Sequence, residues 1–127
     1  MIGPGAYCYA RLDGDFLKCL VDTGSMITFV LRSAVPQSAK LKKANREAYT
    51  ANGSKFRFDS KFEGVVTLGP ARIKMTIFFV ADLQNYHCEL LLGTDCLTKL
   101  PRGRNVAFDF HTKNLLIGDY AIGLISS

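Results

Sequence analysis

The most informative segment of the chain is "CLVDTGSMITFV", residues 19–30. It places one carboxylate, Asp22, between two apolar and β-branched runs, with Thr23, Gly24 and Ser25 directly behind it. Because an unpartnered buried carboxylate is costly, Asp22 must be solvated, hydrogen-bonded or paired. A turn in which the Asp side chain bonds the backbone explains this triplet about as well as a catalytic role does.

The whole chain has the composition of one folded, soluble domain. It has 127 residues, of which 48% are hydrophobic and 21% charged, enough for a single core. No apolar run is long enough to span a bilayer, and the start has no secretion-signal pattern. We expect residues 1–5 to be an extension or a remnant of excision from a longer polypeptide, residues 6–118 to be the domain, and residues 119–127 to be a tail.

The four cysteines have no zinc-ligand spacing, so we expect reduced, mostly buried thiols, with no metal and no cofactor. They are Cys8, Cys19, Cys88 and Cys96. The formal charge is +5 and is densest in "KLKKANR", residues 40–46. No aromatic residues interleave with these positive side chains, so we expect a solvated loop and disfavour nucleic acid as a partner.

Short apolar runs with strand-like alternation are separated by turn signals at intervals of about 8 to 12 residues. Four hairpins are predicted, with turns at Asp13-Gly14, Asn52-Gly53, Gly69-Pro70 and residues 111–114. The other expected elements are a strand at 27–32, a loop with room for one helical turn at 33–47, a short strand at 89–93 and a helix at 94–100. The tail after Gly118 reinforces an interface, folds over the domain or begins a further segment.

Several segments together resemble one protein family. "CLVDTGS" resembles the active-site loop of aspartic proteases, and "LLLGTDCL", residues 90–97, resembles their second signature. "TANGSKFRF", residues 50–58, and "FEGVVTLG", residues 62–69, look like the flap and the strands that follow it. The chain carries a single Asp-Thr-Gly, so the resemblance is to retroviral and retrotransposon proteases, with the retrotransposon branch closer.

The resemblance implies an all-β, retropepsin-like closed barrel with a flap hairpin and one short C-terminal helix, assembled as a homodimer. Two Asp22 carboxylates would share one proton, one activating water as the base and the other acting as the acid. Thr23 would bond across the dimer axis, and Gly24 would present its backbone to the substrate. Ser25 would donate to the outer Asp22 oxygen, which predicts an acidic pH optimum.

The resemblance also assigns supporting residues. The flap tip that closes over the substrate would be Ala51, Asn52 and Gly53. The side-chain pockets would be lined by Leu20, Phe29, Glu89 and Leu91. The motif behind the site would comprise Leu92, Gly93 and Asp95. The chain departs from retroviral members at Met26 and Thr94, where an acidic residue and an arginine often pair.

The implied function is an aspartic endopeptidase that matures the polyprotein encoding it, in the cytoplasm or inside a virus-like particle. A rival is a non-catalytic module of the same fold that dimerises or binds peptides or nucleic acid. His87 and His111 have no carboxylate and nucleophile at useful spacing, so we expect turn or surface histidines. Cys19 or Ser25 as a nucleophile would need a base that the sequence does not show.

Overall fold

The computed structural model describes residues 6–49, 53, 55–80, 88–100 and 106–125. The strands are β1 Ala6–Leu12, β2 Asp15–Val21, β3 Phe29–Leu31, β4 Lys42–Tyr49, β5 Lys55–Leu68, β6 Ala71–Val80, β7 Leu90–Leu92, β8 Val106–Asp109, β9 Asn114–Ile117 and β10 Tyr120–Gly123. The helical elements are the 3₁₀ turn η1 Arg32–Ala34 and the short helix α1 Thr94–Leu97. None of the helices in these ranges is long enough to cross a membrane.

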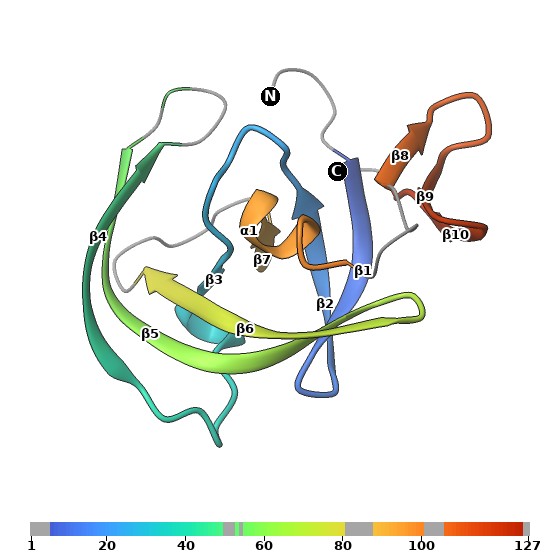
Figure 1. The fold of residues 1–127 in the computed structure, drawn as a ribbon. Helices are drawn as coiled ribbons and strands as arrows, with labels where there is room; N and C mark the ends of the chain where they lie inside the picture. The colour runs from blue at the N-terminus through green and yellow to red at the C-terminus, as the bar shows by residue number, and fades with distance from the viewer. Residues whose placement is uncertain (1–5, 50–52, 54, 81–87, 101–105, 126–127) are drawn as a thin grey trace.

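Six strands close into a barrel. The main sheet has the order β1-β2-β7-β3-β6-β5-β4, and β1 also pairs with β5 at Arg11 and Leu12. This extra pairing joins the two ends of the six-strand path and leaves β4 outside it (Figure 1). The predicted all-β closed barrel with one short helix is therefore confirmed.

Two apolar clusters fill the molecule. The larger lines the barrel interior and includes Leu12, Phe62, Ile77, Leu90 and Leu92, each almost fully buried. The second lies under the β4–β5 hairpin and comprises Tyr7, Leu20, Ile27, Phe29, Ala48, Phe58, Phe78, Cys88 and Leu91. Strand alternation explains why there are two clusters. Successive side chains of β2, β3 and β7 point to opposite faces of the sheet, and those on both faces are apolar.

The predicted hairpin turns agree with the observed register. Leu12 pairs with Asp15, and Asp13 and Gly14 have φ values of 50° and 97°. This left-handed pair is the backbone of a tight two-residue hairpin, which Asp-Gly favours. The β5–β6 hairpin turns at Gly69-Pro70, as expected, because Leu68 pairs with Ala71.

The basic segment differs from its expectation. Residues 33–47 do begin with a helical turn, η1, but β4 starts at Lys42. The expected solvated loop over residues 40–46 is therefore wrong from Lys42 onward. A register shift between Lys43 and Arg46 hides the alternation of this strand, and the 14-residue β5 supplies a partner that local sequence does not reveal.

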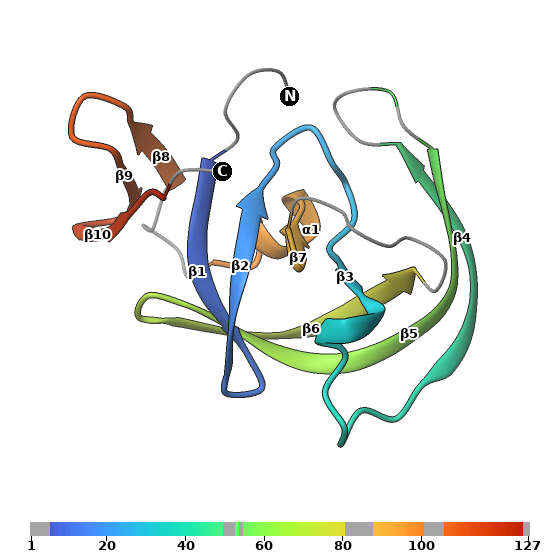
Figure 2. The same cartoon turned by 180° about the vertical axis from the view of Figure 1, so that it is seen from behind.

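The C-terminal segment forms a second sheet of β8, β9 and β10 beside β1 (Figures 1 and 2). The β8–β9 hairpin is present as predicted, but its turn is one residue earlier, at 110–113, because Asn114 belongs to β9 and pairs with Asp109. The tail folds back on its own domain, because β10 pairs with β9 and the Ile125 amide donates to the Tyr7 carbonyl at 2.8 Å. The domain therefore continues past the predicted boundary at Gly118.

Candidate active site

Asp22 lies immediately after β2, where the chain leaves the sheet. Its side chain is only 3% exposed, and its backbone amide donates to the Leu92 carbonyl at 2.9 Å. Its Oδ1 accepts a hydrogen bond from the Gly24 amide at 2.9 Å. Thr23 and Gly24 are exposed. The carboxylate is thus held by its own loop, while the two residues behind it face outward.

Ser25 does not have its predicted partner. Its hydroxyl donates to the Ile27 carbonyl at 2.9 Å, and its Oγ accepts from the Ile27 amide at 3.3 Å. A hydroxyl has one proton to donate, so this side chain cannot also donate to Asp22. The predicted bond is wrong, because the buried backbone groups of Ile27 need partners inside the tight loop. Ser25 therefore gives no reason to expect an acidic pH optimum.

A brace from β7 and α1 holds the loop from behind. The Asp95 carboxylate accepts from the Thr28 hydroxyl at 2.6 Å and from the Thr28 amide at 3.1 Å. The Thr28 Oγ1 in turn accepts from the Gly93 amide at 3.0 Å, and the Thr94 amide donates to the Ser25 carbonyl at 2.8 Å. Sequence reasoning missed Thr28, whose only signal was a hydroxyl inside the apolar run "MITFV".

We expect Thr28→Val to destabilise the protein by about 2 kcal/mol, because it removes a fully buried hydroxyl and leaves two polar groups without their partner. Urea unfolding followed by circular dichroism measures this change. Thr98→Val is the matched control, since the exposed Thr98 hydroxyl bonds the Thr94 carbonyl and no other group among the described residues. Equal urea midpoints for Thr28→Val and Thr98→Val would contradict the claim that the Thr28 hydrogen bonds stabilise the loop.

Gly93 permits the close contact between brace and loop. A Cβ at this position would lie 2.8 Å from the carbonyl oxygens of both Ser25 and Ile27. Both contacts are to backbone atoms, which cannot swing away as a flexible side chain would. Only glycine fits where α1 meets the Asp22 loop.

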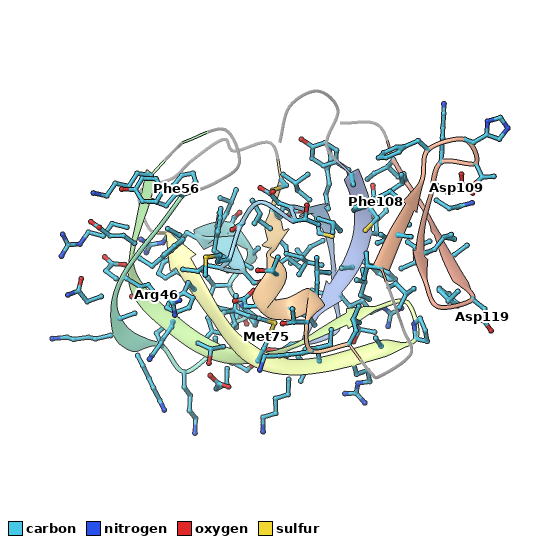
Figure 3. The ribbon with its side chains drawn as sticks, turned by 45° about the horizontal axis from the view of Figure 1, so that its top comes forward. Arg46, Phe56, Met75, Phe108, Asp109 and Asp119 are labelled. Atoms are coloured by element: carbon cyan, nitrogen blue, oxygen red, sulfur yellow. The ribbon has the colours of Figure 1, made fainter. Side chains whose placement is uncertain are left out.

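Three of the four predicted pocket residues are neighbours across β2, β7 and β3. Leu20 pairs with Leu91, and Leu91 pairs with Phe29. All three are buried in the second apolar cluster, where the Phe56 and Phe58 rings of β5 each lie 5.3 Å from the Phe29 ring. They form an apolar floor beneath the β4–β5 hairpin, which carries Phe56 (Figure 3).

Glu89 differs from the other three predicted pocket residues. Glu89 accepts from the Lys18 amide at 3.1 Å, so its carboxylate fastens β2. Gly53 is exposed, with φ of 86°, in the connection between β4 and β5. Ala51 and Asn52, the rest of the predicted flap tip, lie outside the described residues.

The four cysteines are buried free thiols, as predicted. Burial raises the pKa of Cys88 and of Cys96 to about 12. The hydrogen bond with Cys8 and burial raise the pKa of Cys19 well above its usual value. Cys19 is therefore a poor candidate nucleophile, since the reactive form of cysteine is the thiolate.

We expect N-ethylmaleimide at pH 8 to alkylate Cys88 and Cys96 roughly 1,000-fold more slowly in the native protein than in guanidinium chloride. The native pKa values of about 12, against 9.0 for an ordinary thiol, have a second consequence. The free energy of unfolding should fall as the pH rises from 9 to 12, because these thiols lose their protons at lower pH in the unfolded state than in the folded state. Peptide mass spectrometry measures the labelling. A thiol added by Lys40→Cys, at an exposed position, should react quickly in both states. If it were protected in the native protein as strongly as Cys88 and Cys96, burial would not be the cause of their slow alkylation.

The remaining candidates are the two histidines and the two positions that depart from the retroviral pattern. His111 is exposed in the β8–β9 turn, where its amide donates to Asp109 at 3.1 Å. His87 lies outside the described residues. Within the described ranges, no three His, Cys, Asp or Glu side chains gather as a metal site requires. Met26 is 72% exposed beside the loop, and Thr94 contributes its backbone to the brace.

Comparison with known proteins agrees with this geometry. Residues 5–103 match the family model described as retroviral aspartyl protease. No curated protein matched the sequence. The retroviral protease-like domain of Ddi1 from Leishmania major matches with a TM-score of 0.65 and 13% identity, over 98% of this chain and 96% of that one. The EIAV protease, solved with the inhibitor HBY-793, matches with a TM-score of 0.58 and 13% identity, over 74% of this chain and 86% of that one.

The family match covers most of the chain, and it includes both the Asp22 loop and the brace of β7 and α1. The solved structures carry the same closed barrel. The predicted resemblance and the predicted fold are both confirmed. The chain belongs to the retroviral aspartyl protease family.

Proposed function

We propose that this chain is an aspartic endopeptidase that cuts extended polypeptides as a homodimer. The observation that carries the proposal is the braced Asp22 loop. It holds one nearly enclosed carboxylate while Thr23 and Gly24 remain exposed. One chain contains one such loop, so a second copy must supply the second carboxylate of an aspartic protease site.

The chemistry follows from two like charges held close together. Two facing Asp22 carboxylates cannot both ionise cheaply, so the pair shares one proton. The ionised carboxylate takes a proton from a bound water, which attacks the scissile carbonyl. The protonated carboxyl polarises that carbonyl and later gives its proton to the leaving nitrogen. The exposure of Thr23 and Gly24 supports roles in meeting the second copy and the substrate.

The apolar floor indicates the substrate class. Leu20, Phe29 and Leu91 are covered by the β4–β5 hairpin in the single chain. They would favour apolar side chains next to the cut when that hairpin lifts, admits an extended chain and closes over it. A retroelement polyprotein, matured in the cytoplasm or in a virus-like particle, is the substrate that the family favours. A second candidate is a protease-like domain of a larger cellular protein, favoured by the nearly end-to-end match to the Leishmania domain.

We expect proteolysis to depend on assembly. When the enzyme is diluted below its dimer dissociation constant, the rate of cleavage of an unfolded protein should fall with the square of enzyme concentration, because two chains build one site. Fluorogenic assays between about pH 4 and pH 7, with sedimentation at the same concentrations, measure both quantities. A peptide-like statine inhibitor should abolish cleavage. A strictly monomeric species that cleaves at micromolar concentration would overturn the shared site.

A further inference from the structure

A hollow of about 520 Å³ lies between β1 and β10. None of its lining residues belongs to the Asp22 loop, β7 or α1. A second hollow of about 470 Å³ adjoins it, sharing Arg11 and Thr67 and reaching Arg72. Together they form one groove, the β1–β10 groove, large enough for part of a bound polypeptide.

One wall of the groove is an unpaired strand edge of β1. The Tyr7 carbonyl accepts from the Ile125 amide, so it points away from β2. Backbone groups in a strand alternate in direction, so the amide and carbonyl of Tyr9 also point away from β2. Within the described part of the chain, β5 pairs with β1 only from Arg11 onward. Among the described residues no backbone group bonds Tyr9 on this side, so Tyr9 presents a donor and an acceptor to the groove.

The opposite wall is the outer edge of β10. The Leu124 amide donates to the Lys113 carbonyl at 2.9 Å, which turns the even-numbered residues of this segment toward β9. By alternation, Ala121 and Gly123 turn their backbone groups to the other side, where Ile125 bonds Tyr7. The two edges thus begin paired at Tyr7 and Ile125 and then diverge, which opens the groove.

The side chains around these edges are aromatic and basic. Tyr9 is 56% exposed, Phe16 65% and Tyr120 49%. The Arg11 guanidinium lies 4.2 Å from the centre of the Phe16 ring. Neither Arg11 nor Arg72 forms an ion pair with the described residues.

Asp13 also lines the second hollow, where its Oδ1 accepts from the Val65 amide at 2.8 Å. With two arginines against this one carboxylate, the groove offers net positive charge and apolar rims. Its open backbone groups are those of Tyr9 on one wall and of Ala121 and Gly123 on the other.

We propose that the β1–β10 groove binds an extended segment of another polypeptide, one that carries a carboxylate side chain between apolar residues. The segment would insert as a strand and join the two sheets. The donor and acceptor of Tyr9 on one wall and those of Ala121 and Gly123 on the other match a peptide backbone, whereas a nucleic acid backbone lacks the donors. The four residues of β10 span about 13 Å, which suits a partner strand of similar length. Arg11 and Arg72 select for the carboxylate.

The experiment uses the full chain carrying Asp22→Asn, so that the probe is not consumed. The probe is a fluorescein-labelled hexapeptide in which valine and threonine alternate and one central threonine is replaced by glutamate. We expect saturable binding by fluorescence anisotropy, at least threefold tighter than for the same peptide with lysine in place of glutamate. The preference should shrink as salt rises.

Two variant pairs locate the site. Ala121→Pro removes the outward amide at an edge where proline is tolerated, and it should weaken binding at least tenfold, whereas Ala121→Ser keeps the amide and the affinity. Arg11→Gln should abolish the preference for glutamate, and Lys43→Gln, an exposed charge on β4, should retain it. Binding unchanged in Ala121→Pro would overturn the proposal. So would displacement of the probe by a single-stranded oligonucleotide, or a change from dimer to monomer in Ala121→Pro, which would assign the edge to a second copy.

Discussion

Asp22→Asn is expected to reduce peptide hydrolysis roughly 1,000-fold or more, because it removes both the base and the acid from the proposed dimeric site. The fold should survive. An Asn side-chain oxygen can still accept from the Gly24 amide, which is the bond that Asp22 makes at 2.9 Å. Cleavage of an unfolded protein between about pH 4 and pH 7, followed by mass spectrometry of the products, measures the effect.

The matched control is Asp119→Asn, at an exposed position between β9 and β10 and far from the Asp22 loop (Figure 3). It should retain the rate of the unaltered protein. Equal cleavage by the Asp22 and Asp119 variants would refute the aspartic mechanism. If no protein cleaves and no statine peptide binds, the rival reading as a non-catalytic module stands instead.

Gly93→Ala is expected to have the largest effect on stability, about 3 kcal/mol, with a fall of about 10 °C in the midpoint of thermal unfolding. The added methyl group would meet two backbone oxygens at 2.8 Å, and relieving that overlap must move either α1 or the Asp22 loop. Activity should fall with stability, because the displaced loop carries the carboxylate. Differential scanning calorimetry measures the midpoint.

Gly123→Ala provides the comparison, because a Cβ at Gly123 would meet nothing within 4 Å. Its midpoint should stay within about 2 °C of the parent. A Gly93→Ala protein as stable as the Gly123→Ala protein would show that the brace is loose and does not position Asp22.

Much of the fold could be predicted from local sequence. Asp13-Gly14 and Gly69-Pro70 mark tight turns, because few other residues take the left-handed backbone that Asp13, Gly14 and Gly69 adopt, and proline has a fixed φ that suits a turn. The apolar alternation around them predicts strands, and the closed barrel followed from the family resemblance. The failure was non-local: most of β4 was expected to be a loop, because its pattern is broken by a bulge and its partner is β5.

In the candidate site, too, local sequence predicts one part and tertiary structure decides the rest. The sequence by itself determined where the carboxylate lies, because Asp22 interrupts an apolar run at the end of a strand. Only the tertiary structure decided which distant groups meet: Asp95 bonds Thr28 across 67 residues, and the tail after Gly118 folds back onto β9 and β1. The Ser25 bond to Ile27 is local, two residues along the chain, and a side chain that competes for neighbouring backbone groups explains it. Turn and strand preferences are properties of neighbouring residues, whereas a hydroxyl or a strand edge takes whichever partner the folded chain brings within reach.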